Sequence, residues 1–232
     1  MTDAVVINGS PTLDKGDTSL VVRPFVEGLA EAGAKVDLLY AARLKPKPCS
    51  CGRMVCWNET PGECCVRDSM QPIYPILRQA EILVLATPVY IPLPGAMQEL
   101  INRLCPLLDP LQCTFRDGRT RAGFRSNVAI RHIVLICVSG WWETGNCGTV
   151  LRIAEEFAAD AGLPLAGALL RPHAWALRQQ GKLTADGEAV LAAVRSAGRQ
   201  IVARGTIDSA TLEAVSRPLI SREDYWRSQA GA

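Results

Sequence analysis

Hydroxyl side chains are concentrated in a short segment near the start of the chain. Ser10 follows an apolar run, and Thr18 and Ser19 supply the N-cap of the next apolar-periodic segment. Hydroxyl groups beside the backbone N–H groups of a helix N-terminus bind phosphate, because the donors converge and the helix dipole favours negative charge. The segment is therefore a candidate phosphate site. A hydroxyl-rich helix cap without a ligand is the alternative interpretation.

Cysteines are concentrated in a second segment, residues 44–69, which holds five of the nine in the chain. Thiolates bind [4Fe–4S] clusters and structural zinc, so both are candidates, beside thiols that bind nothing. The predicted metal ligands are Cys49, Cys51, Cys56 and Cys64, with Cys65 as a substitute for Cys64. Prolines and glycines leave no room for a regular element here, so the segment is expected to be an inserted loop.

Other catalytic motifs are missing from the sequence. Neither the GxxxxGK[ST] pattern of nucleoside-triphosphate hydrolases nor the GxGxxG fingerprint of dinucleotide-binding domains occurs. The two histidines, His132 and His173, belong to no HExxH motif and flank no GxSxG serine. These absences argue against zinc-protease and serine-hydrolase chemistry, and no catalytic side chain is assigned.

Alternating apolar and amphipathic segments are expected to position these residues. Buried strands are predicted at residues 4–8, 36–40, 82–86, 133–138 and 165–170. Helices are predicted from residue 18 to about 31 and over about 70–79, 95–108, 149–161 and 186–204, while residues 109–128 are expected to form a surface excursion without periodicity. This alternation predicts an α/β fold with a five-stranded parallel sheet, strand order 2-1-3-4-5, and helices on both faces.

The third predicted strand leads into a loop that is stiffened by Pro88, Pro92 and Pro94. Open α/β folds bind ligands at the carboxyl ends of their strands, next to the point where the strand order reverses. In the predicted order, the loops after the first, third and fourth strands meet at this point. One ligand site is therefore expected between these three loops.

Three motifs, taken in order, resemble those of the flavodoxin-like NAD(P)H-dependent FMN reductases. They are Gly9-Ser10-Pro11 with Asp17-Thr18-Ser19, Thr87-Pro88-Val89-Tyr90 with Pro94-Gly95-Ala96-Met97, and Ser139-Gly140-Trp141. The segment from Cys56 to Cys64, followed by Asp68-Ser69-Met70, is similar to the iron–sulfur flavoprotein branch of that group. The resemblance extends over nearly the whole chain and implies a flavodoxin-like three-layer sandwich.

The resemblance implies an FMN site with NAD(P)H as co-substrate. Ser10, Thr18 and Ser19 would hold the phosphate, and members often carry an arginine where this chain has Thr12 and Leu13, so Lys15 would supply that charge. The other cofactor-binding residues implied are Pro11 and Asp17 in the first loop, Pro88, Val89, Tyr90 and Ile91 along the isoalloxazine edge, partly through backbone groups, and Ser139, Gly140 and Trp141 on the third side. Core or interface packing is the alternative for Tyr90, Trp141 and Trp142.

The cysteine spacing departs from that of the related iron–sulfur flavoproteins. Their early cysteines are separated by two residues, whereas here one residue lies between Cys49 and Cys51 and four lie between Cys51 and Cys56. This shift favours thiols without a metal, although a [4Fe–4S] cluster and a zinc site stay open. The remaining cysteines are interpreted as small buried hydrophobic residues.

The leading functional hypothesis is an FMN-dependent oxidoreductase that accepts hydride from NAD(P)H and passes electrons to a quinone, flavin, nitro compound or protein. A flavodoxin-like or iron–sulfur flavoprotein electron carrier without NAD(P)H oxidation is the first alternative, and a module held by structural zinc is the second. The flavin would carry the chemistry, so no side-chain acid or base is required. The resemblance also implies a homodimer or a higher homo-oligomer.

Composition limits the remaining partners. The net charge is only +2, with 25 basic and 23 acidic residues dispersed along the chain, so a nucleic-acid partner is not expected. No leader peptide or membrane-spanning run is evident, and a cytoplasmic protein is expected. Residues 1–232 are interpreted as a single domain, with an insertion at about 44–69 and a tail at about 205–232.

Overall fold

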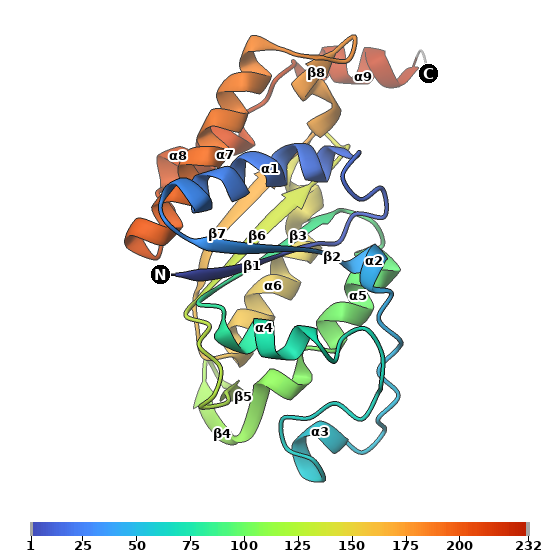
Figure 1. The fold of residues 1–232 in the computed structure, drawn as a ribbon. Coiled ribbons are helices and arrows are strands. Elements are labelled where there is room, and N and C mark those ends of the chain that lie inside the picture. The colour runs from blue at the N-terminus through green and yellow to red at the C-terminus, as the bar shows by residue number, and fades with distance from the viewer. Residues whose placement is uncertain (1, 231–232) are drawn as a thin grey trace.

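The fold is built on a five-stranded parallel sheet in the computed structural model, which describes residues 2–230 (Figure 1). The strands lie side by side in the order β2-β1-β3-β6-β7, and every neighbouring pair is parallel. Their bounds are β1 (Asp3–Asn8), β2 (Lys35–Tyr40), β3 (Ile82–Pro88), β6 (His132–Val138) and β7 (Leu165–Arg171). The predicted flavodoxin-like order is therefore confirmed, and the strand order reverses between β1 and β3.

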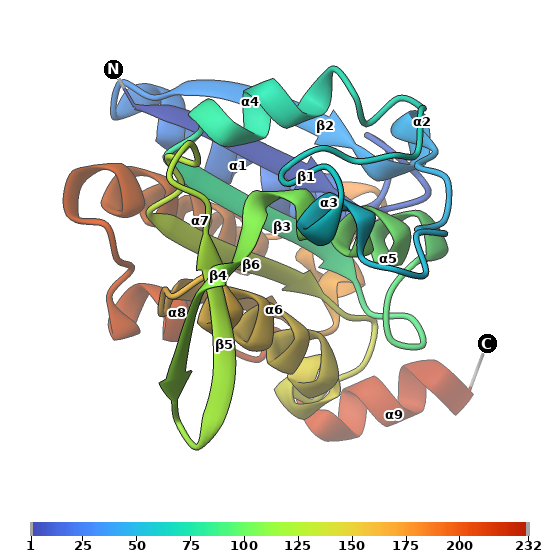
Figure 2. The same ribbon diagram turned by 90° about the horizontal axis from the view of Figure 1, so that it is seen from below.

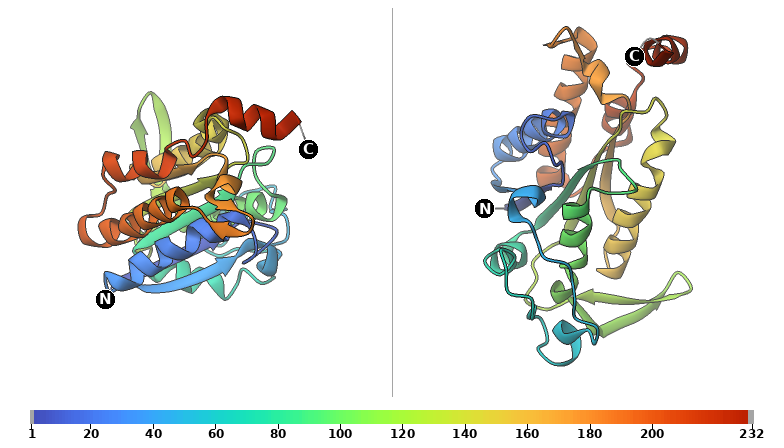
Figure 3. Two further views of the ribbon diagram at one scale, coloured as in Figure 1. Left: turned by 90° about the horizontal axis from the view of Figure 1, so that it is seen from above. Right: turned by 90° about the vertical axis from the view of Figure 1, so that its right-hand side faces the viewer.

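Helices cover both faces of this sheet (Figures 1 and 3). One face packs against α1 (Asp17–Glu31), α7 (Ala185–Arg204) and α8 (Ser209–Ser216), and the other against α4 (Ile73–Gln79), α5 (Gly95–Asn102) and α6 (Gly148–Asp160). Helices α1 and α7 approach so closely that a Cβ at Gly28 would lie 2.0 Å from the Arg195 carbonyl oxygen. No helix in residues 2–230 is both long enough and apolar enough to span a membrane.

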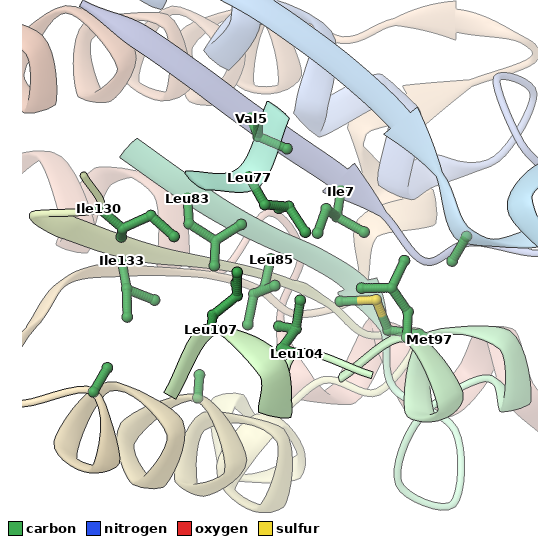
Figure 4. Close-up of a cluster of buried hydrophobic side chains, with 14 of the residues drawn as sticks. Val5, Ile7, Leu77, Leu83, Leu85, Met97, Leu104, Leu107, Ile130 and Ile133 are labelled. Carbon is green, nitrogen blue, oxygen red and sulfur yellow. The ribbon is translucent and has the colours of Figure 1, made fainter. Parts of the chain in front are cut away.

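Alternation along the strands divides the core between the two faces. Val5, Ile7, Leu83 and Leu85 point toward the layer of α4 and α5, where they meet Leu77 and Met97 (Figure 4). The intervening residues, such as Val6 and Val84, pack against the layer of α1 and α7. Because both faces are covered, the strands are continuous apolar runs rather than alternating ones.

The segment expected to be a surface excursion without periodicity contains a β-hairpin. Strands β4 (Leu108–Arg116) and β5 (Arg119–Phe124) pair antiparallel and project from the body of the molecule (Figure 2). The hairpin turns at Asp117 and Gly118, which have φ angles of 51° and 73°. An Asp-Gly pair is typical of the tight turn that joins two antiparallel strands, so the sequence contained a hairpin signal that the prediction missed.

Helix α5 also ends earlier than predicted. It stops at Asn102, and the 3₁₀ turn η1 (Cys105–Leu107) follows in place of a helix extending to residue 108. Pro106 lies within this turn, and a proline deep in an α-helix would remove a backbone hydrogen bond and clash with the preceding turn. At this break the chain leaves the helix layer that contains α5 and enters β4, the first strand of the hairpin.

The two irregular regions contain more regular structure than expected. The cysteine segment begins at the end of α2 (Ala41–Leu44) and includes a one-turn helix, α3 (Val55–Asn58), which the prediction lacked. After α7 the chain forms α8 and then α9 (Arg222–Ala230), which extends beside the carboxyl edge of the sheet (Figures 1 and 2). Short elements complete the chain: η2 (Thr144–Cys147), η3 (Ala174–Leu177), β8 (Arg178–Gln179) and β9 (Lys182–Leu183).

A buried ion pair fastens the cysteine segment to the sheet layer. Arg103, directly after α5, donates to both carboxylate oxygens of Asp68 at 2.7 and 3.0 Å, and its side chain has no solvent exposure. The same guanidinium donates to the carbonyl groups of Lys47 and Val66. Burial alone would raise the pKa of Asp68, but hydrogen bonds from Arg103 and two backbone N–H groups lower it to about 2.

Candidate active site at the carboxyl edge of the sheet

The loops after β1, β3 and β6 meet at one cleft of about 300 Å³. Eight of the predicted cofactor-binding residues line it: Ser10, Asp17, Thr18, Pro88, Val89, Tyr90, Ser139 and Gly140. Four further lining residues were missed: Thr12, Gly16, Val138 and Ala174. Pro11, Lys15, Ser19, Ile91 and Trp141 belong to the same loops but are not among the lining residues. The convergence of three loops that are remote in sequence is thus present in the structure.

Asn8, which is fully buried at the end of β1, stabilises the first loop through hydrogen bonds. The Asn8 side chain accepts from the Ser10 N–H at 2.9 Å and donates to Ser19 Oγ at 2.8 Å. Ser19 Oγ in turn donates to the Leu13 carbonyl. The Ser19 hydroxyl is therefore engaged within the loop and does not face the cleft, whereas the resemblance implied that it holds a phosphate.

Ser10 and Thr12 form a hydroxyl pair at the floor of the same loop. Their Oγ and Oγ1 atoms are 2.9 Å apart, and Ser10 Oγ also accepts from the Thr12 N–H at 3.3 Å. A Cβ at Gly16 would lie 2.1 Å from Thr12 Oγ1, so glycine leaves the room that this hydroxyl occupies. Thr12, a residue with no role in the sequence prediction except as the replacement for an arginine, belongs to the polar lining.

The N-cap of helix α1 lies two residues before Thr18, the first residue of the predicted cap. Gly16 is the N-cap, while Thr18 and Ser19 lie buried in the first turn. The prediction that Thr18 and Ser19 cap the helix is therefore wrong, because the side-chain oxygen of Ser19 is used by the loop instead. The helix still directs its N-terminal N–H groups toward the cleft, which Asp17 and Thr18 line.

In the second loop, side chains rather than the N–H groups of Val89 and Tyr90 are available to a ligand. The Val89 N–H donates to the Val138 carbonyl at 2.9 Å, and the Tyr90 N–H donates to the Pro92 carbonyl at 2.8 Å. These two N–H groups are therefore engaged within the protein. Tyr90, which lines the cleft, is 54% exposed, and Ile91, the next residue of the loop, is fully exposed.

The third loop is ordered by Ser139. Its hydroxyl accepts from the Trp141 N–H at 3.0 Å, and its carbonyl accepts from the Ala174 N–H at 3.0 Å. Trp175 Nε1 donates to the Gly140 carbonyl at 3.2 Å, which holds the turn from the outside. Trp141 is 56% exposed beside the cleft, a position in which its ring is free to stack on a ligand.

A buried pair behind the third loop connects it to the C-terminal segment. His173 Nε2 accepts from the Leu219 N–H at 3.0 Å, and Arg171 donates to the carbonyl groups of Val215 and Arg217. Burial and the positive charge of Arg171 lower the pKa of His173 to about 4, so the imidazole is neutral at pH 7. This histidine therefore acts as a structural acceptor, and sequence reasoning gave it no role.

The predicted metal ligands do not form a metal site. Cys49 and Cys51 lie 3.5 Å apart through their Sγ atoms, but Cys56 and Cys64 are buried, and burial raises the pKa of the Cys56 thiol to about 12. Within residues 2–230, no group of three or more His, Cys, Asp or Glu side chains is arranged to hold a metal ion. The [4Fe–4S] cluster and the zinc ion therefore stay predictions.

The comparisons with known proteins agree with the fold. A family described as NADPH-dependent FMN reductase matches residues 2–120. An iron–sulfur flavoprotein from Methanocaldococcus jannaschii is 30% identical over 110 residues, which are 47% of this chain and 53% of that protein. The match thus spans about half the length of this curated relative.

Solved structures share the fold at low sequence identity. An NAD(P)H:quinone oxidoreductase from Methanothermobacter marburgensis has a TM-score of 0.61 at 17% identity, covering 86% of this chain and 96% of that one. An FMN-dependent NADH-azoreductase from Bacillus anthracis, solved with FMN, has a TM-score of 0.56 at 12% identity, covering 89% and 100%. The fold matches these structures, and the family match includes two of the three loops of the cleft, so this chain belongs to the NADPH-dependent FMN reductase family.

Proposed function

We propose that this protein is an FMN-dependent oxidoreductase that takes hydride from NAD(P)H and passes electrons to a quinone, free flavin, nitro compound or protein acceptor. The observation that carries the proposal is the single cleft formed by the loops after β1, β3 and β6, at the point where the strand order reverses. Membership of the family supports FMN as the ligand of this cleft.

The first loop suits the phosphate end of the cofactor. Ser10, Thr12 and Thr18 supply hydroxyl groups next to the N-terminus of α1, whose dipole favours an anion. Asp17 carries negative charge, so it suits the ribityl hydroxyls as an acceptor rather than the phosphate. Three of the loop's predicted cofactor-binding residues do not line the cleft: Pro11, Lys15 and Ser19. Ser19 stabilises the loop through its hydrogen bonds with Asn8 and the Leu13 carbonyl.

The second and third loops suit the ring. Pro88, Val89 and Tyr90 form one wall of the cleft, and Ser139 and Gly140 form the facing one. FMN, when bound, supplies the hydride-accepting centre and the electrons for the acceptor. The task of the chain is therefore to hold the ring and to leave one side open for stacking, which the exposed rings of Tyr90 and Trp141 flank.

Anaerobic mixing with NADPH tests this function. We expect purified protein loaded with FMN to lose its flavin absorbance at ~450 nm when NADPH is added, because hydride transfer reduces the cofactor. Addition of a quinone should then restore the absorbance. Chemical reduction with dithionite is the control for a competent flavin. A flavin that dithionite bleaches and neither NADH nor NADPH reduces would identify an electron carrier instead.

We further propose that a second copy of the chain covers the mouth of the cleft. Tyr90, Ile91 and Trp141 are large apolar side chains that remain exposed around it. Exposed apolar groups gathered at one place are typical of an interface. Light scattering on the FMN-loaded protein should give a dimer mass, and Ile91→Asp should shift it toward the monomer, while Leu111→Asp on the hairpin should not. We also propose that the protein is located in the cytoplasm, as expected from the sequence.

A further inference from the structure

Two cysteines on the segment between α2 and α3 already lie close to each other. The Sγ atoms of Cys49 and Cys51 are 3.5 Å apart, and the Cys49 side chain is exposed to solvent. A disulfide needs an S–S distance of about 2.05 Å, so a small rotation of the side chains would bring the two atoms into bonding range.

The backbone on both sides of this pair is held in place. Before it, the Lys47 N–H donates to Asp68 at 2.8 Å and the Lys47 carbonyl accepts from Arg103 at 2.8 Å. After it, the Cys51 carbonyl accepts from the Met54 N–H at 3.2 Å, at the start of α3. The buried Asp68–Arg103 pair thus fixes the approach of the chain to the two thiols.

The other predicted ligands of the segment, Cys56 and Cys64, are buried. Cys64 is 4% exposed and its thiol is a hydrogen-bonding neighbour of the Tyr74 hydroxyl and of Arg103. Cys56 is 2% exposed, and its thiol is a hydrogen-bonding neighbour of Cys51. An iron–sulfur cluster needs four thiolates that converge on one centre, and the structure offers one accessible pair.

We propose that Cys49 and Cys51 form a reversible dithiol–disulfide site in place of an iron–sulfur cluster, with a low-molecular-weight disulfide such as oxidised glutathione as the oxidant. The Cys49 thiolate attacks one sulfur of that disulfide, which forms a mixed disulfide and releases one thiolate. The Cys51 thiolate then attacks Cys49 Sγ, which forms the Cys49–Cys51 bond and expels the second thiolate. The protein loses two electrons and two protons, and the small disulfide gains them as two thiols.

The sequence around the pair makes the test direct. Lys45 and Lys47 are each followed by proline, so trypsin leaves a single peptide from residue 44 to residue 53 that contains these two cysteines and no other. The folded protein is equilibrated anaerobically in mixtures of reduced and oxidised glutathione, quenched with N-ethylmaleimide, digested and analysed by mass spectrometry. We expect the doubly alkylated peptide to be replaced by an unalkylated peptide. Its mass should be lower than that of the reduced, unalkylated peptide by two hydrogen atoms.

Variants separate the proposed pair from general oxidation. Cys51→Ser should trap a glutathione adduct on Cys49, while Cys65→Ser, which removes an exposed thiol of the same segment, should leave the disulfide unchanged. The proposal fails if both cysteines stay alkylated at every ratio, or if oxidation joins either of them to another cysteine. Anaerobically purified protein that contains iron lost in Cys51→Ser would also overturn it. The measurement requires neither FMN nor NADPH, so its outcome is independent of the proposed activity.

Discussion

Individual hydroxyl groups in the first loop have different tasks, although the sequence presents them as equivalent. Ser10 bonds to Thr12 across the floor of the cleft, and Thr18 lines it. Ser19, in contrast, satisfies the buried amide of Asn8 and the Leu13 carbonyl. Substitutions that remove a hydrogen bond to the ligand should therefore change the Kd for FMN. Substitutions that remove a hydrogen bond within the loop should change the free energy of unfolding.

Replacing Ser10 and Thr18 together with alanine should weaken FMN binding. A hydrogen bond to a charged group contributes about 1.5–3 kcal/mol, so loss of each phosphate partner should raise the Kd roughly tenfold or more. Fluorescence titration of the apoprotein with FMN measures the Kd. Ser209→Ala, at an exposed position on α8, is the matched control. An unchanged Kd in the double variant would remove both residues from the phosphate site.

Ser19→Ala should instead reduce the stability of the apoprotein. The substitution leaves the buried Asn8 side-chain amide without its acceptor, which costs about 1–3 kcal/mol. Urea denaturation of protein freed of FMN measures the free energy of unfolding. If Ser19→Ala left that free energy intact and raised only the Kd for FMN, the hydroxyl would be a phosphate ligand, as the resemblance implied.

At the scale of elements, one ion pair connects the cysteine segment to the end of α5. Asp68 belongs to the Asp68-Ser69-Met70 motif that carried the family resemblance, whereas Arg103 follows α5. The structure gives a physical reason for the aspartate in this motif, since the two side chains meet with almost no solvent exposure. The segment is therefore anchored at Lys47, Val66 and Asp68 even though most of it has no regular structure.

Asp68→Asn should destabilise the folded protein by about 3 kcal/mol, because it leaves the guanidinium of Arg103 buried without a counter-charge. The native pKa of Asp68 is lowered to about 2 from an ordinary value of 3.8. The carboxylate therefore stabilises the fold fully above pH 4, and this contribution is lost as the pH falls from about 4 to 2. The free energy of unfolding of the variant should vary less with pH over that interval.

Elements whose apolar residues fill a core were predictable from the sequence, and those that project from the body were not. The runs at residues 82–86 and 133–138 face helices on both sides, so their composition identified them as strands. The strand order followed from the alternation of strands and helices and the common order of such folds. Strand β4 exposes Leu111 and Phe115 and contains Pro110, so no buried face gave it a period. Only its Asp117-Gly118 turn carried a signal.

At the scale of the whole molecule, the C-terminal segment contacts the third loop and the buried His173 behind it. No local sequence pattern predicts these contacts. Trp142 Nε1 donates to the Ile220 carbonyl at 3.2 Å, and His173 accepts from Leu219. Arg171 is fully buried, and its guanidinium donates to the carbonyl groups of Pro172, Val215 and Arg217. Partners more than forty residues away cannot be inferred from periodicity, and the sequence therefore left His173 without a role.

These contacts make His173 a determinant of stability in mild acid. Burial and Arg171 lower its native pKa to about 4, below the ordinary value of 6.5, so the folded protein binds the proton less readily than the unfolded chain. The contribution of the neutral imidazole is complete above pH 6.5 and falls as the pH drops toward 4. One pKa unit corresponds to about 1.4 kcal/mol, so the loss is at most about 3.5 kcal/mol.

His173→Gln should remove this pH dependence and lower the stability at pH 7. The glutamine side chain offers an acceptor for the Leu219 N–H but does not titrate, so the slope of unfolding free energy between pH 6.5 and 4 should flatten. His132→Gln, at the only other histidine, is the matched control and should retain the part of the slope that His173 causes. Because His173 Nδ1 also donates to the Trp142 carbonyl in the third loop, FMN release measured over the same pH range should follow unfolding in the native protein and lose that correlation in the variant. Equal slopes in the native protein and His173→Gln would show that the imidazole is not the group that links the C-terminal segment to the cleft.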